Sequence, residues 1–247
     1  MIDEFNDEFL KMEDTANHSS TSELHIKASN GDLHGIMEIM RDGYNPMDKD
    51  KYGNCALHYA AREGHLHILK YFIDELGFNP TVTGANNYTP LHHSILKCHL
   101  PVVQYLLQEK DVEALCYSDY KITPLHLACY RGHIDIAMEL IKNVSTYLHG
   151  DYNVLHASVD NTTPLHLAAS RGQLNVIKYL TMEIKCDPMA RDSYGNTLVH
   201  AAAFYGHLHI IKFFVSYFSW CGLVNKAVLL YANVWGCGLV IKTVLRC

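Results

Sequence analysis

The sequence predicts an all-α solenoid of stacked helix-turn-helix units with projecting β-hairpin loops. The first observation is a Leu-His or Val-His pair that returns in steps of 33, 34, 34, 40 and 34 residues. A fixed period in this range is typical of repeat architectures. The second observation is a glycine six residues after the histidine in every copy except one, where Cys98 takes its place. The histidines of the pairs are His25, His58, His92, His126, His166 and His200.

One copy, residues 163–182, shows why each repeat should fold as two helices. Thr163 suits a helix N-cap, and Pro164 suits the first helical position, where no amide donor is needed. Gly172 suits the left-handed turn that ends a helix. A second helix should follow, because apolar residues recur every three positions at Leu174, Ile177 and Leu180.

Two helices of this length are marginal in water when they stand alone. Each pair also has apolar residues that only a neighbouring pair can cover, so we expect the array to be stable collectively. Asn-Pro or Asp-Pro turns should end several copies, at Asn45-Pro46, Asn79-Pro80 and Asp187-Pro188.

The T-P-L-H motif occurs without change at residues 89–92, 123–126 and 163–166, and on these motifs the chain resembles the ankyrin repeat family. The resemblance implies an ankyrin-repeat solenoid whose anchor histidines hydrogen-bond near the helix start and link adjacent repeats. It also implies non-catalytic protein binding, as an adaptor or scaffold, through the concave inner-helix face and the hairpin tips.

We expect three regions along the chain. Residues 1–20 form an acidic tail that we expect to be disordered, residues 21–215 form the array of six repeats, and residues 216–247 form a hydrophobic tail. The hydrophobic tail aligns with an earlier copy, with Gly236 on Gly64, and is interpreted as a degenerate seventh repeat. The 40-residue step places about six extra residues within 142–161, where a longer finger loop is the simplest interpretation.

Net charge, the N-terminal sequence and the cysteine spacing weigh against several classes of function and location. The net charge of −6 leaves no basic excess, which weighs against nucleic-acid binding. The N-terminus lacks the pattern of a secretory signal, and the eight cysteines have no C-x-x-C spacing. We therefore expect a monomer in the cytosol, with the nucleus as an alternative. The sequence shows no metal, cofactor or catalytic motif, so we expect no cofactor and no enzyme activity.

The resemblance assigns the candidate binding residues by position, at the fourth and fifth residues after each anchor histidine and at the finger tips. Along the inner face these positions are basic in the middle and aromatic at the far end, so we expect a protein partner with an acidic segment. Arginine is also a good exposed helix former, which is the simpler explanation. The candidates are Arg62, Glu63, Lys97, Tyr130, Arg131, Arg171, Phe204 and Tyr205 on the helices, and Tyr52, Tyr120, Arg191 and Tyr194 on the tips.

The acidic tail also contains Ile2, Phe5, Phe9 and Leu10 at helical intervals. A disordered tail or a helix that caps the first repeat explains this pattern, and a segment that masks the chain's own binding face is the sharper hypothesis.

Two other functions stay open at this point. One is a membrane-associated or channel-linked module that uses residues 210–241 as an anchor. Against it, the run from Ala227 to Ile241, which contains only one polar residue, has 15 residues, whereas a spanning helix needs about 20. The other is a subunit that presents substrates within an enzyme complex.

Overall fold

The computed structural model describes residues 22–109, 112–119, 121–147 and 161–218. The chain divides into two compact units, which we describe separately. The N-terminal unit comprises Met1–Pro124 with Glu139–Val144, and the C-terminal unit comprises Leu125–Met138 with Ser145–Cys247. The predicted tail at residues 1–20 lies outside the described residues, as do residues 219–247 of the predicted tail at 216–247 and most of the predicted finger insertion, at 148–160.

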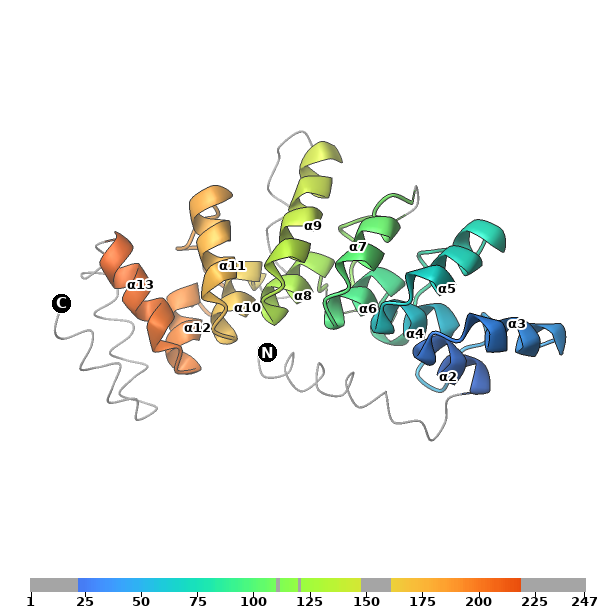
Figure 1. Ribbon diagram of the computed structural model, residues 1–247. Coiled ribbons are helices and arrows are strands. Elements are labelled where there is room, and N and C mark those ends of the chain that lie inside the picture. Colours follow the sequence, from blue (N-terminus) through green and yellow to red (C-terminus); the bar gives the residue numbers. More distant parts are fainter. Residues whose placement is uncertain (1–21, 110–111, 120, 148–160, 219–247) are drawn as a thin grey trace. The chain divides into compact units, whose positions relative to one another are not determined.

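The N-terminal unit contains three helix pairs among its described residues (Figure 1). In each pair a short inner helix is followed by a second helix that lies beside it. The second helix of the middle pair ends in a π-helical turn, and a short 3-10 turn precedes the third pair. The elements are α2 (Glu23–Asn30), α3 (Leu33–Arg41), α4 (Ala56–Glu63), α5 (Leu66–Lys70), η1 (Tyr71–Glu75), η2 (Ala85–Asn87), α6 (Pro90–Leu96) and α7 (Leu100–Leu106).

The C-terminal unit repeats the same arrangement. Its inner helices α10 and α12 pack against each other, and α12 packs against its own second helix. A π-helical turn again ends one second helix, at the position that matches η1. Pro124 and Glu139–Val144, which belong to the N-terminal unit, lie in helices α8 and α9. The elements are α8 (Pro124–Arg131), α9 (Ile134–Tyr147), α10 (Pro164–Ser170), α11 (Leu174–Lys178), η5 (Tyr179–Glu183), α12 (Leu198–Phe204) and α13 (Leu208–Phe218).

The local signals in the copy at 163–182 act as the sequence predicts. Thr163 is the N-cap of α10, and Pro164 occupies its first turn. Gly172 adopts φ +75°, a left-handed conformation that most side chains avoid. Ile177 and Leu180 are fully buried, whereas Leu174 is only partly buried. The helix-turn-helix prediction is confirmed for this copy.

Small residues let successive inner helices approach closely. Ala60 and Ala61 in α4 are fully buried, as are Ala168 and Ala169 in α10. Cys129 occupies the matching position in α8 and is also fully buried. The core of each unit is thus a line of small inner-helix residues backed by the aliphatic stripe of the second helices, as in a stacked solenoid.

Two details differ from the expected fold. The projecting loops keep a hairpin turn, in which Asp192 N–H donates to the Asn196 carbonyl at 2.9 Å, but no β-ladder forms among the described residues. In addition, α9 runs to Tyr147, so the first part of the predicted insertion at 142–161 extends a helix and not a finger. Apolar residues up to Val144 continue the helical pattern of α9, which explains the extension.

Candidate functional site

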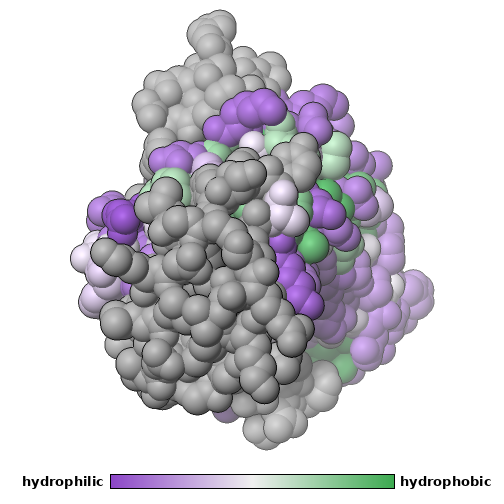
Figure 2. All heavy atoms as spheres, turned by 90° about the vertical axis from the view of Figure 1, so that its left-hand side faces the viewer, coloured by the Kyte–Doolittle hydropathy of each residue, from purple (hydrophilic) through white to green (hydrophobic). Residues whose placement is uncertain are grey.

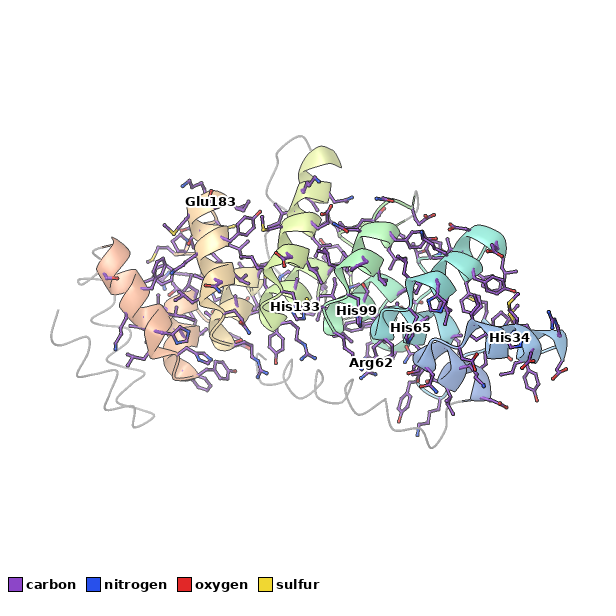
Figure 3. All side chains as sticks on the ribbon, viewed as in Figure 1. His34, Arg62, His65, His99, His133 and Glu183 are labelled. Atoms are coloured by element: carbon purple, nitrogen blue, oxygen red, sulfur yellow. The ribbon has the colours of Figure 1, made fainter. Side chains whose placement is uncertain are left out.

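In the N-terminal unit, the last turns of α4 and α6 bring three predicted binding residues together. Lys97 Nζ lies 2.7 Å from Glu63 Oε1 and 2.6 Å from Oε2. Arg62 Nε lies 3.9 Å from Glu63 Oε1, and the Arg62 side chain is only 7% exposed. Figure 3 shows Arg62 at the end of α4. One carboxylate therefore serves two cations, which reduces the positive charge that this face offers to a partner.

The C-terminal unit carries positive charge at the matching positions without an acidic residue among them. Arg171 directly follows α10, and its guanidinium carbon lies 4.9 Å from the centre of the Tyr130 ring in α8. Tyr130 is 2% exposed, so its ring acts as a platform beneath the exposed Arg171. Such a cation–π contact restrains the guanidinium above the ring and leaves its N–H groups available to carboxylates. Arg131, at the end of α8, is partly buried.

The next inner helix adds an aromatic pair. Phe204 ends α12 and Tyr205 caps it, with ring centres 4.9 Å apart and planes inclined at 73°. The Phe204 side chain is 37% exposed. We refer to Tyr130, Arg131, Arg171, Phe204 and Tyr205 together as the Arg-aromatic surface, because stacked helices of one unit deliver all five from their last turns.

The finger residues are positioned by short turns. In the last finger, Asp192 Oδ1 accepts hydrogen bonds from the backbone N–H of Tyr194 at 2.9 Å and of Asn196 at 2.7 Å. Tyr194 is thereby held at the tip with 70% of its surface exposed. Arg191 donates to the Gly195 carbonyl at 2.6 Å, so this side chain also closes the turn.

The first finger repeats that turn around Asp50, whose Oδ1 accepts from the N–H groups of Tyr52 and Asn54, each at 2.8 Å. Lys51 Nζ lies 4.8 Å from the centre of the Tyr52 ring. Tyr120 lies outside the described residues.

The anchor histidines link neighbouring repeats, as the family resemblance implies. In His166, Nδ1 accepts from the backbone N–H of Thr163 at 3.2 Å, and Nε2 lies 2.9 Å from the Asn196 carbonyl of the next repeat. His58 makes the same two contacts, with Cys55 N–H at 3.1 Å and the Val82 carbonyl at 3.1 Å. Because Nδ1 accepts a hydrogen bond from a backbone N–H, it carries no proton, so the ring is neutral and its Nε2–H is the donor to the carbonyl.

Burial reinforces this neutral state. Desolvation lowers the pKa of His58, His92 and His126 to about 4. Desolvation also lowers the pKa of His166 and His200. A ring whose two nitrogens both hold backbone groups has no lone pair free for proton transfer, so the geometry suits a structural link between repeats.

A second set of histidines contacts backbone carbonyls at the end of the preceding inner helix. His65 Nε2 lies 2.9 Å from the Ser29 carbonyl, and His67 Nε2 lies 3.0 Å from the Gly31 carbonyl. His207 and His209 repeat these contacts with Ser170 and Gly172, each at 2.9 Å. Figure 3 shows His65 and His99 at the starts of successive second helices. Among the described residues, no group of three or more His, Cys, Asp or Glu side chains is arranged to hold a metal ion.

Sequence reasoning missed one recurring contact on the second helices. Lys70 Nζ lies 5.7 Å from the Tyr105 ring centre, and Lys178 Nζ lies 5.3 Å from that of Phe213. Each lysine thus stacks on the aromatic ring 35 residues later, in the following repeat. That constant interval between a lysine and an aromatic residue is the signal that could have revealed the contact.

The described surface offers no broad apolar face in the view of Figure 2, where the coloured atoms are mainly hydrophilic and the hydrophobic areas are small. Within the part of the chain that the structure describes, no helix combines the length and the apolar character needed to cross a bilayer. Most of the suggested anchor at 210–241 lies beyond these residues.

Comparison with known proteins agrees with this geometry. A family model described as ankyrin repeats in three copies matches residues 24–116, 110–192 and 143–222. A search of the curated proteins gave no match. Among solved structures, the crystal structure of the human ASB11 ankyrin repeat domain is similar, with a TM-score of 0.66 and 23% sequence identity over 80% of this chain and 84% of that chain. Ankyrin repeats are in general protein–protein interaction modules. The chain described here belongs to the ankyrin repeat family.

Proposed function

We propose that the chain is a non-catalytic adaptor or scaffold that binds a partner protein, and that the Arg-aromatic surface of the C-terminal unit is its principal contact. The observation that carries this proposal is Arg171 over the Tyr130 ring, together with the Phe204–Tyr205 pair at the end of the next inner helix, α12. Arginine and aromatic side chains dominate the energy of protein interfaces, and a guanidinium fixed by stacking loses little entropy on binding.

The chemistry of the surface favours an acidic partner segment with apolar anchors. Within the described residues, the guanidinium of Arg171 makes no hydrogen bond or ion pair, so a carboxylate can approach it without displacing another group. Arg131 lies on the adjacent inner helix and adds a second positive charge. Phe204, at 37% exposure, offers apolar area to a partner side chain beside these charges.

The N-terminal unit is less suited to the same partner. Its Lys97 is bonded to Glu63, and that carboxylate would repel an incoming acidic group. We therefore assign Arg62, Glu63 and Lys97 a secondary role, in which they select against wrong partners more than they add affinity. Tyr194 at the finger tip is a further contact for a partner that extends past the helix ends.

Charge reversal tests the assignment. The double variant Arg131→Glu and Arg171→Glu should lose the partner set that the unaltered chain captures from cells, as identified by mass spectrometry. The control is Lys212→Glu, which makes a charge reversal at an exposed position on the second helix α13. All three proteins should give the same far-ultraviolet circular dichroism. An unchanged partner set with the double variant refutes the assignment of the surface.

A further inference from the structure

Resting on this proposed function, we infer that His207 and His209, on either side of the first residue of α13, belong to the same binding site and couple it to protons. When an acidic partner segment binds at Arg171, Nδ1 of each ring takes up a proton. Histidine changes charge between about pH 5 and 8, so the affinity of the Arg-aromatic surface for such a segment rises as the pH falls from 7.5 to 6.

The two rings hold the backbone on either side of Arg171. His207 Nε2 donates to the Ser170 carbonyl and His209 Nε2 donates to the Gly172 carbonyl, each at 2.9 Å. The rings meet edge to face, with their centres 5.9 Å apart. A Cβ atom on Gly172 would lie 2.8 Å from His207 Nδ1, so this ring packs closely against the residue that follows Arg171. The next repeat thus places two histidines beside the arginine of the surface.

These two rings can gain a proton without losing a contact, unlike the anchor histidines. In His166, Nδ1 accepts from the Thr163 N–H, so a proton at Nδ1 would break that bond. In His207 and His209 the carbonyl contact uses the Nε2–H, which is present in both the neutral and the protonated ring. Within the described part of the chain neither Nδ1 forms a hydrogen bond, and His207 is half-buried while His209 is exposed. Each Nδ1 is therefore available for a proton.

The charges that act on His207 explain why binding and protonation are linked. Burial lowers the pKa of His207, and the nearby charges of His209 and Arg171 lower it further. A carboxylate bound at Arg171 offsets that positive charge and raises the pKa of the ring. Because the complex then holds protons that the free chain releases, a fall in pH favours the complex.

The elements packed against the start of α13 bring mainly basic groups to this place. Lys178 of α11 lies over the Phe213 ring, which is one turn along α13 from His209. A positive charge on either ring therefore adds to an existing positive surface and gains most from a bound acidic group. The titratable groups of these elements are His166 and Arg171 at α10, Lys178 on α11, His200 and Tyr205 at α12, and Lys212 on α13 itself.

The chain itself supplies a conservative replacement for the two histidines. Gln173 and Asn175 occupy the matching positions at the start of α11, and Gln173 packs against Gly132 as His207 packs against Gly172. Glutamine and asparagine therefore fit this turn, and their side-chain amides can donate to carbonyls but do not titrate.

The chain also supplies a matched control. In the N-terminal unit, His65 and His67 make the same contacts with Ser29 and Gly31, at 2.9 and 3.0 Å. The residue between those two carbonyls is the uncharged Asn30, so this histidine pair has no arginine to assist.

The test measures binding of a labelled acidic amphipathic peptide of Glu, Leu and Phe to the full-length chain. Fluorescence anisotropy is recorded at pH 7.5 and at pH 6.0, at constant ionic strength, with circular dichroism at both pH values to confirm the fold. The affinity of the unaltered chain should rise about twofold to fivefold at the lower pH, because two exposed charges are added beside the bound carboxylates. The same peptide with Gln in place of Glu should show no rise.

In the variant His207→Gln with His209→Asn, the affinity at pH 7.5 should match that of the unaltered chain, and the rise at pH 6.0 should disappear. The control His65→Gln with His67→Asn should keep the rise. If the double variant at 207 and 209 does not fold, His209→Asn alone, at an exposed ring, decides the question. It should lose part of the rise, and an undiminished rise overturns the inference.

Arg171→Glu separates this inference from the proposed function. If Arg171→Glu abolishes peptide binding, but the rise is absent from the unaltered chain or persists in the His207→Gln, His209→Asn variant, the inference is overturned and the proposed function stands. If the peptide binds equally to the unaltered chain and to Arg171→Glu, or to neither, both fail.

Discussion

At the scale of single residues, the effect of a buried histidine on stability depends on whether its two ring nitrogens form hydrogen bonds. His166 is 1% exposed and is bonded at both nitrogens. His93 is 4% exposed, yet neither of its ring nitrogens has a hydrogen-bond partner among the described residues. It lies edge-on to His58, with ring centres 5.2 Å apart, at a position where α8 and α10 have Leu127 and Leu167. Histidine therefore stabilises the fold at position 166 and destabilises it at position 93.

Replacing each of these histidines with leucine should change stability in opposite directions. His93→Leu removes an unpaired buried polar group and should raise the free energy of unfolding by about 1 kcal/mol. His166→Leu leaves the Thr163 N–H and the Asn196 carbonyl unpaired and should lower it by about 2 to 4 kcal/mol. Urea unfolding followed by circular dichroism measures both. A destabilised His93→Leu variant would mean that the His93 ring makes a polar contact in the folded protein.

At the scale of the helix pair, the turn between the two helices is set by a glycine and by the histidine of the next repeat. Gly172 has φ +75°, and a Cβ atom placed there would lie 2.8 Å from His207 Nδ1. That histidine ring donates to the Ser170 carbonyl at 2.9 Å. The glycine is thus required twice, for its backbone conformation and for the close approach of the neighbouring ring.

Gly172→Ala should accordingly destabilise the protein more than an alanine at a glycine that needs only the left-handed conformation. Gly195→Ala is the matched control, because Gly195 has φ +80° but no described atom lies within 4 Å of the added Cβ. We expect a loss of about 1 kcal/mol for Gly195→Ala and a further 1 kcal/mol or more for Gly172→Ala. Equal losses in thermal unfolding would show that His207 moves aside without cost.

The comparison of sequence and structure also belongs at this scale. Periodicity predicted the helix pairs, because the glycine, the proline and the apolar stripe are local signals. It could not show that Arg171 lies on Tyr130, or that Glu63 holds Lys97, because both contacts join side chains about one repeat apart in the chain. The extension of α9 to Tyr147 was missed because the insertion was assigned as a whole to a loop. The position of each candidate residue was therefore predictable, but its partners were not.

At the scale of the whole molecule, the stack depends on many neutral buried histidines, and this makes its stability sensitive to acid. The pKa of His58, His92 and His126 falls to about 4 in the folded chain, against about 6.5 when unfolded. Unfolding therefore takes up protons between these values. Stability should be complete above pH 6.5 and should fall as the pH drops from 6.5 towards 4.

Each such histidine should cost about 1 to 2 kcal/mol of stability by pH 5. The urea midpoint at constant ionic strength should consequently fall between pH 7 and pH 5, and the fall should be smaller in His126→Leu than in the unaltered chain. A midpoint that does not change over this range would mean that these rings are protonated in the folded protein, which would contradict the backbone hydrogen bonds to Nδ1.

The most direct test of the binding surface is hydrogen exchange measured by mass spectrometry on the unaltered chain, with and without a saturating acidic amphipathic peptide. We predict that the peptide slows exchange in the segments around residues 130–131, 170–171 and 204–205, and leaves exchange in α11 and α13 unchanged. Slowed exchange confined to the second helices, or none at all at saturation, would contradict the assignment of partner binding to the Arg-aromatic surface.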